Sequence, residues 1–225
     1  MQELVWAETN VAGPQHFEGR LLPPGSPTGF YRDIALLAFP TADPHRIPDI
    51  EIKAAYSKAV VNRLRATPPG TNHPFTKAID QGGITNLSAR LLSNGRLVWD
   101  VPPGQWTIMR FGHASNGVGM KPVPKSGQGL NCDKLSPAGI EANFAGMMAK
   151  LSADTGLKPN ELKNSGLVAT HIDSWENGAQ NWTPRMREEF LARRGYDLLG
   201  FLPTLTGRVV DSLEVSERFL WDLRQ

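Results

Sequence analysis

Hydrophobic and polar residues alternate in short runs through residues 1–115. The clearest runs are 33–39, 95–101 and 104–112, and Pro, Gly, Asn and Asp are frequent between them. A period of two residues is typical of strands that bury one face. Short strands at this spacing predict a β-rich, sandwich-like region over residues 1–115.

Two turn signals separate these runs, Ser93-Asn-Gly-Arg96 and Val101-Pro-Pro-Gly104. Proline and glycine favour turns and interrupt regular strands, so we expect a strand to end at each signal. Residues 49–67 have a partly helical spacing of apolar side chains. The pattern leaves the structure of that segment open.

After residue 130 the apolar residues recur every three or four positions, which is typical of helices. Ser136 and Pro137 form an N-cap and a first-turn proline, and the apolar spacing then continues to a stop signal at 154–156. Three more helices are predicted. The first starts at Thr183-Pro184 and ends at Gly195. The second starts at Tyr196 and stops at Pro203, and the third starts at Asp211 or Ser212.

A short apolar run, 167–173, lies between the first two of these helices and predicts a strand. Helix, strand and helix in this order are typical of βα units around a parallel sheet. We therefore expect an α/β fold in which residues 116–225 form part of a (β/α)8 barrel. A complete barrel takes about 250 residues, and fewer than half of these remain. The sequence thus predicts a truncated chain, a piece of a longer protein.

Charge and composition exclude several classes of function. The formal net charge is +2 over 225 residues, so we expect no nucleic-acid partner and no anionic membrane surface. No apolar run approaches the roughly 20 residues of a membrane-spanning helix. The single cysteine, Cys132, excludes an internal disulfide framework. The first ten residues have no signal-peptide pattern.

The segment 171–176 carries the most informative polar residues. If 167–173 is a barrel strand, His171 and Asp173 face the barrel interior, and Glu176 lies just beyond the strand's carboxyl end. A carboxylate at that place can act as a general acid or base. Side chains that can stack on sugar rings or bind hydroxyls lie around it: Trp175, Asn177, Gln180, Asn181 and Trp182.

A second group, Asp133 and Lys134, precedes the helix that starts at Ser136. Asp133 can hold a ligand hydroxyl or a cation, and Lys134 can neutralise it. The simpler interpretation is a loop salt bridge near a helix start. The acidic and aromatic residues around Glu176 can also be explained by structure alone. In that interpretation Asp173 and Glu176 cap a turn, and the tryptophans lie in the core. No zinc pattern occurs, a calcium site is the more plausible metal site, and the metal ligands stay unknown.

Six stretches of the chain together resemble one known family. They are GFYRDI (29–34), WDVPPGQWTI (99–108), GLNCDKLS (129–136), HIDSWENGAQNWTP (171–184), RRGYD (193–197) and SERFLWD (216–222). They resemble glycoside hydrolase family 106, which contains α-L-rhamnosidases. The resemblance covers essentially all of the chain, and family members are much longer than 225 residues.

The resemblance implies a barrel catalytic domain with β-sandwich elements that hydrolyses terminal α-L-rhamnose with inversion, and a calcium ion near the sugar. It assigns Glu176 as the general base, with the general acid beyond Gln225. The residues expected to shape the sugar or calcium site are His171, Asp173, Trp175, Gln180, Trp182, Asp133 and Lys134. One departure is Asn131, where the family motif is expected to have Glu.

Two other functions stay open. The chain can be a non-catalytic carbohydrate-binding module on the same scaffold, or a structural domain without a sugar site. For the enzyme we expect a rhamnose-containing carbohydrate as partner. We also expect a periplasmic or extracellular location for the longer protein, because polysaccharide-degrading enzymes are usually exported.

Overall fold

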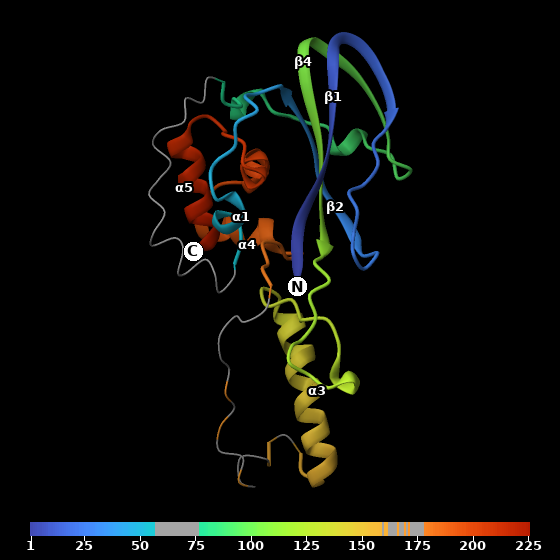
Figure 1. The fold of residues 1–225 in the computed structure, drawn as a ribbon, viewed down its shortest axis with the longest axis vertical. Coiled ribbons are helices and arrows are strands. Elements are labelled where there is room, and N and C mark those ends of the chain that lie inside the picture. The colour runs from blue at the N-terminus through green and yellow to red at the C-terminus, as the bar shows by residue number, and fades with distance from the viewer. Residues whose placement is uncertain (57–76, 159, 162–165, 167–168, 170, 172–177) are drawn as a thin grey trace.

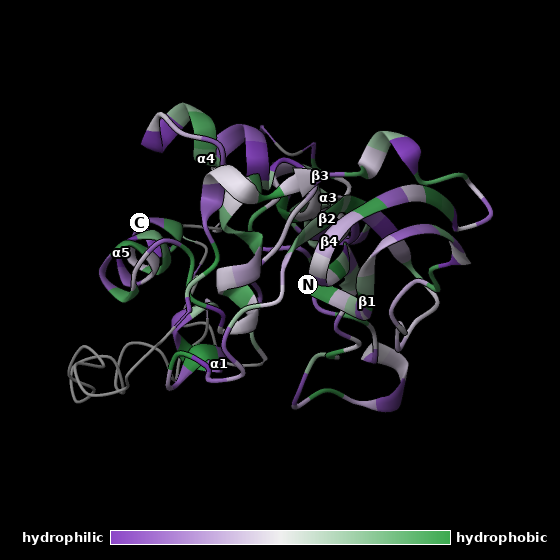
Figure 2. Cartoon of the chain, turned by 90° about the horizontal axis from the view of Figure 1, so that it is seen from above, coloured by the Kyte–Doolittle hydropathy of each residue, from purple (hydrophilic) through white to green (hydrophobic). Residues whose placement is uncertain are grey.

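The computed structural model describes residues 1–56, 77–158, 160–161, 166, 169, 171 and 178–225. An antiparallel sheet contains β1 (Gln2–Arg20), β2 (Tyr31–Pro40), β3 (Thr85–Asn86) and β4 (Arg96–Ser115) in the order β1-β4-β2-β3. One face of this sheet is covered by α1 (Ile50–Lys53), α4 (Met186–Arg194), the 3-10 helix η5 (Leu198–Thr206) and α5 (Leu213–Arg224) (Figures 1 and 2). The helix α3 (Pro137–Thr155) extends away from both layers (Figure 1). Short 3-10 turns, η1 (Gln81–Gly83), η2 (Ser88–Arg90) and η3 (Lys125–Gly127), lie in the connections.

The strands β1 and β4 form one long ribbon that bends near its middle. Gly13 pairs with Gly104, and the next pair is Gln15 with Val101, so the prolines between these positions are skipped. Proline cannot donate a hydrogen bond to the ladder, which explains the register shift. The ribbon curves over at this place (Figure 1). The predicted strand end at 101–104 is therefore wrong, because β4 bends there and continues.

The bend gives the sheet a second buried face. Leu36 and Ala38 of β2 pack against Leu97 and Trp99 from the folded-over part of the ribbon. Trp99 meets Trp106 edge to face, with ring centroids 5.4 Å apart. The β-rich prediction for residues 1–115 is confirmed as a single bent antiparallel sheet in the described part of the chain, and a sandwich of two sheets is not shown.

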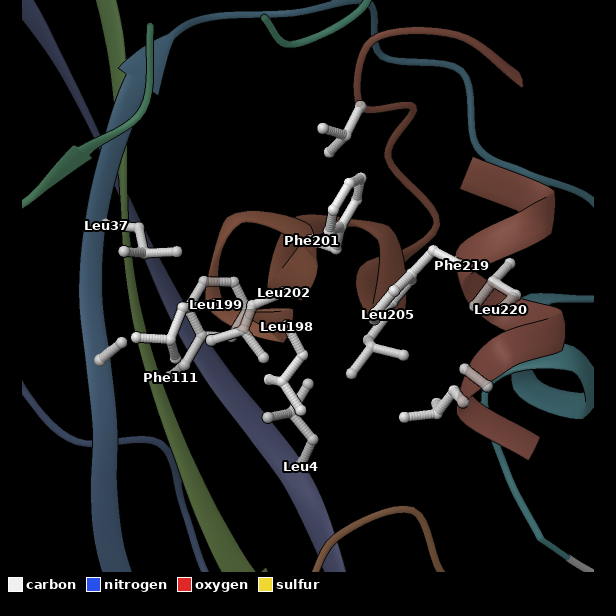
Figure 3. Packing of buried hydrophobic residues seen from close by; sticks show 14 of the residues in the cluster. Leu4, Leu37, Phe111, Leu198, Leu199, Phe201, Leu202, Leu205, Phe219 and Leu220 are labelled. Atoms are coloured by element: carbon white, nitrogen blue, oxygen red, sulfur yellow. The ribbon is translucent and has the colours of Figure 1, made fainter. Parts of the chain in front are cut away.

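The larger core lies between the sheet and the helical layer. Leu37 and Phe111 point from the sheet toward Leu198 and Leu202 of η5 (Figure 3). On the far side of η5, the ring of Phe219 stacks on Phe201 with centroids 5.0 Å apart (Figure 3). Alternate residues of β2 thus serve two different cores, which explains why 35–39 is apolar throughout.

The sequence signals for α3 are confirmed at both ends. The Ser136 hydroxyl accepts a 3.4 Å hydrogen bond from the Gly139 amide, and Gly156 ends the helix at φ 69°. The apolar face was predicted from spacing alone, and most of it is exposed to solvent. Its exposed members are Ile140, Phe144, Met147 and Leu151.

The C-terminal helices lie close to where they were predicted, but α4 begins at Met186 and not at Thr183-Pro184. The predicted stop at Pro203 is wrong, because η5 passes through that residue. A 3-10 helix is built from short i to i+3 turns, so one missing amide hydrogen is tolerated. Ser212, rather than Asp211, caps α5 and accepts a 3.1 Å hydrogen bond from the Val215 amide. Val215, whose apolar side chain would suit the buried face of α5, is 38% exposed.

The predicted barrel over 116–225 is not shown. Within the described residues no named strand follows Ser115, and the strand pairings of the sheet are antiparallel. The predicted strand 167–173 falls mostly outside the described residues, and its two described members, Ala169 and His171, are not in a strand. The barrel thus stays a prediction for the longer protein.

Among the residues described, no helix is long and apolar enough to cross a membrane.

Candidate functional site

The segment 178–183 follows the acidic motif, which is the segment 171–176 of the sequence analysis, and forms hydrogen bonds with other segments of the chain. Gln180 exchanges two backbone hydrogen bonds with Tyr56, at 2.7 and 3.0 Å. The Leu4 amide donates to Oδ1 of Asn181 at 2.7 Å, and Asn116 Nδ2 donates to the Ala179 carbonyl at 2.7 Å. These contacts fix the course of the chain where it leaves the acidic motif.

Asp133 lies at the centre of this arrangement and accepts four hydrogen bonds. Its Oδ1 accepts from Gln180 Nε2 and from the Leu135 amide at 3.1 Å. Its Oδ2 accepts from Thr183 Oγ1 at 2.9 Å and from Gln2 Nε2 at 3.3 Å. Four donors match the acceptor sites of one carboxylate. Asp133 therefore joins the start of β1 to the segment 178–183.

Gln180 is fully buried, and its side-chain amide is satisfied. Its Nε2 donates to Asp133 and, at 3.0 Å, to the Trp182 carbonyl, while its Oε1 accepts from the Lys134 amide at 3.2 Å. Glutamine suits this place because one side chain supplies both donors and an acceptor. A buried amide with these partners holds two loops together.

His113 extends the network on its sheet side. Its Nδ1 lies within hydrogen-bonding distance of Gln2 Oε1, while Gln2 Nε2 donates to Asp133. Because Oε1 can only accept, this bond assigns the proton to Nδ1. Burial lowers the pKa of His113 below its ordinary value. The imidazole is therefore neutral at pH 7 and carries no charge into the network.

The structure brings some of the predicted site residues together and leaves others apart. Asp133, Gln180 and the backbone of Lys134 form the network described above. Trp182 lies in the core at 3% exposure, so its ring offers no face to a sugar in this structure. This burial agrees with the structural alternative, in which tryptophan is core.

The structure describes one of the remaining predicted residues. His171 is exposed. Asp173, Trp175 and Glu176 lie outside the described residues. The assignment of Glu176 as general base therefore stays a prediction.

Gln2 and Thr183 complete the network and were not predicted from the sequence as site residues. Gln2 is 131 positions from Asp133. No spacing rule within a single element connects residues so far apart. A threonine before a proline predicts a helix start, and it gives no sign that its hydroxyl binds a distant carboxylate.

The described residues do not fit a calcium site. They contain no group of three or more His, Cys, Asp or Glu side chains that could hold a metal ion. Asp133, which could hold a cation or a ligand hydroxyl, already accepts four hydrogen bonds. Calcium binding stays a prediction from the family resemblance, and the chemistry proposed below does not depend on it.

The fold is similar to that of a solved glycoside hydrolase. The structure of a rhamnosidase from Novosphingobium sp. PP1Y superposes on 99% of this chain with a TM-score of 0.75. The two sequences are 22% identical, and the chain covers 34% of the solved one. This likeness establishes the fold, a mixed α and β architecture shared with part of a rhamnosidase.

The sequence identifies the family. The family model described as alpha-L-rhamnosidase, glycoside hydrolase family 106, matches residues 38–225. The chain therefore belongs to this family, and the resemblance seen in its motifs is confirmed.

One curated relative carries a different name. A protein of Formosa agariphila named "Putative beta-glucuronidase" is 38% identical over 231 residues. The match takes in 100% of this chain and 19% of the relative. The chain thus spans about a fifth of the length of that relative.

Proposed function

We propose that this chain is part of an enzyme that hydrolyses terminal α-L-rhamnose from glycans or glycosides. The observation that carries the proposal is the family match over residues 38–225, which includes the complete motif 171–184. The network at Asp133 supports it. It joins two of the family-like motifs, 129–136 and 171–184, through hydrogen bonds of Asp133 to Gln180 and Thr183.

We propose Glu176 as the general base of an inverting reaction. In such a reaction one carboxylate takes a proton from water as the water attacks the anomeric carbon. A second carboxyl group gives a proton to the leaving oxygen. The two groups stand roughly 6.5–9.5 Å apart so that water fits between them. The segment 178–183 then has a positioning role, because its bonds to Asp133, Leu4 and Tyr56 fix the chain just after Glu176.

A β-glucuronide is the second candidate substrate, on the strength of the name given to the Formosa agariphila relative. A cavity of about 400 Å³ also bears on this candidate, because Arg185, Arg193 and Arg194 line it. Guanidinium groups bind carboxylates well. Two of these arginines, however, are paired with Glu189, at 3.1 Å for Arg185 and 3.3 Å for Arg193, so the cavity is less cationic than its composition suggests.

The test is an assay of the complete polypeptide that contains this chain. We expect release of rhamnose from an aryl α-L-rhamnoside and no release from the matching aryl β-D-glucuronide. Proton NMR of the first-formed sugar reports inversion or retention. Glucuronide turnover without rhamnoside turnover would overturn the substrate assignment. Sugar binding with neither turnover would favour the non-catalytic module.

A further inference from the structure

Two exposed side chains of the motif GFYRDI lie beside the network at Asp133. Arg32 is the register partner of His113 across β2 and β4, so both side chains point to the same face of the sheet. Phe30 reaches the same place, because its ring meets the His113 imidazole edge to face with centroids 5.7 Å apart. His113 lies within hydrogen-bonding distance of Gln2, which donates to Asp133. A row of contacts therefore connects Arg32 with the network.

Strand alternation separates the two charged residues of this motif. Asp33 follows Arg32 directly and points to the opposite face, where Arg110 donates to both of its carboxylate oxygens. Within the described part of the chain, Arg32 forms no ion pair with any carboxylate. Its positive charge is thus left uncompensated among these residues.

The guanidinium of Arg32 is oriented by two contacts and keeps one edge open. It lies over the ring of Phe30, 5.3 Å from the centroid, and its Nη1 donates to the Tyr31 carbonyl at 3.0 Å. Its Nε and Nη2 make no hydrogen bond to the residues that the structure describes. These two N–H groups lie side by side and match the two oxygens of a carboxylate. The contact with Phe30 reduces the conformational freedom that Arg32 would lose on binding one.

The neighbours of Arg32 on this face do not compete for its charge. Burial lowers the pKa of His113, and of the two charges that act on it, Asp133 raises this pKa and Arg32 lowers it. The imidazole is neutral at pH 7 and so offers Arg32 no negative partner. The Asp133 carboxylate accepts its four hydrogen bonds from other donors. An oriented guanidinium without a partner on this face favours the binding of an anion.

We propose that Arg32 is a specificity-determining residue, and that it binds the carboxylate of an acidic sugar attached to the rhamnose. Rhamnose itself carries no charge, so the carboxylate belongs to the sugar on the other side of the cleaved bond. The inference rests on the proposed function and narrows it to glycans in which rhamnose is linked to a uronate. An arginine with only a structural role would not distinguish a uronate from its uncharged ester.

Two pairs of substrates test the proposal on the complete polypeptide that contains this chain. They are rhamnosyl-glucuronate and rhamnosyl-galacturonate disaccharides, each compared with its own methyl ester, which differs mainly in charge. We expect kcat/KM for the acid to exceed that for the ester about tenfold in at least one pair, because a hydrogen-bonded contact between ions stabilises the complex by about that factor. Equal values in both pairs would overturn the proposal.

Variants of Arg32 show whether this residue causes the preference. Arg32→Gln keeps a hydrogen-bonding side chain without the charge, so the ratio of acid to ester should fall to about one. Arg32→Lys keeps the charge and loses the planar edge, so it should retain only part of the preference. Arg90→Gln is the control, because Arg90 is an exposed arginine of η2 that likewise has no ion pair in the described chain. It should keep the ratio of the parent.

Binding calorimetry separates this inference from the proposed function. The polypeptide can bind the acid more tightly than the ester, and lose that difference in Arg32→Gln, without cleaving any rhamnoside. That result would support Arg32 and refute the proposed function. Rhamnoside cleavage with the same acid-to-ester ratio in the parent and in Arg32→Gln would do the reverse.

Thermal unfolding identifies the competing explanation, in which a carboxylate of the longer polypeptide pairs with Arg32. In that case Arg32→Gln would lower the melting temperature and leave the acid-to-ester ratio unchanged, and the proposal would be wrong. We expect equal melting temperatures and a lost preference. If Arg32→Gln fails to fold, Arg32→Lys decides, because an unchanged ratio in that variant contradicts the role of the planar edge.

Discussion

Thr183 donates a 2.9 Å hydrogen bond to Oδ2 of Asp133, which lies fifty residues earlier in the chain. Each residue belongs to one of two family-like motifs, 129–136 and 171–184. The bond shows that the motifs meet in space. The polar residues of 129–136 therefore have a structural role that their spacing does not reveal, which is to hold the segment that follows the acidic motif.

Removing the Asp133 carboxylate should destabilise the protein. In Asp133→Ala the buried amide of Gln180 and the hydroxyl of Thr183 lose their acceptor. Leaving two such donors unsatisfied is expected to lower the free energy of unfolding by about 3 kcal/mol. Urea unfolding followed by tryptophan fluorescence measures the loss.

Asp100→Ala is the matched control for that experiment. The Asp100 side chain is 88% exposed and pairs with His16 at the surface. Such pairs contribute about 0–1 kcal/mol, so the control should change the free energy of unfolding little. Equal losses in the two variants would show that the network at Asp133 does not hold the segment 178–183.

Glu176→Gln should abolish rhamnoside hydrolysis by the complete polypeptide. Glutamine is close in shape to glutamate but cannot take a proton from water, so kcat should fall by about a hundredfold or more. Binding of the sugar, measured by calorimetry, should persist. Glu214→Gln, at an exposed start of α5, is the control and should leave kcat unchanged. Retained turnover in Glu176→Gln would refute its assignment as base.

The ion pair between Arg110 and Asp33 should make stability depend on pH. Arg110 Nε and Nη2 donate to the two carboxylate oxygens of Asp33 at 2.7 and 2.8 Å. These bonds hold the pKa of Asp33 below its ordinary value. A lowered folded-state pKa means that the pair stabilises fully above the unfolded pKa of about 4, and that this contribution is lost as pH falls.

Asp33→Asn should therefore cost about 1 kcal/mol at pH 7, since its carboxylate is partly exposed. The difference from the parent chain should shrink as pH falls below about 4, where the parent carboxylate takes up its proton. Chemical unfolding at pH 7, 5 and 3 measures this trend. Asp154→Asn, an exposed position on α3, should show little difference throughout. A cost that grows toward acid would contradict the ion-pair account.

Leu202 should be among the costliest core positions to truncate. It is fully buried between the sheet and α5 (Figure 3). Leu202→Ala is expected to lower the free energy of unfolding by about 2–5 kcal/mol through lost burial and the cavity left behind. Leu22→Ala, at 62% exposure, should cost far less. Thermal unfolding compares the two variants. Similar melting temperatures would contradict the contribution of Leu202 to the core.

Local signals in the sequence predicted the individual elements well where a short rule applies. The start of α3 at Ser136 and Pro137 and its end at Gly156 follow from capping preferences that act within one turn. The strand β2 follows from an apolar run of strand length. The sequence predicts a turn where β4 bends, because Pro102 and Pro103 interrupt the hydrogen-bond ladder in a turn and in a bent strand alike. Only the pairing with β1 distinguishes the bend from a turn.

The amino-acid sequence by itself determined the family, the β-rich first part, the helical second part and the positions where most helices begin and end. These properties depend on neighbours within a few residues. Only the tertiary structure decided that Gln2 meets Asp133, that Trp182 is core and that Arg32 lies beside His113. Such contacts depend on strand register and on packing between distant segments, and the same local pattern is compatible with many of these arrangements.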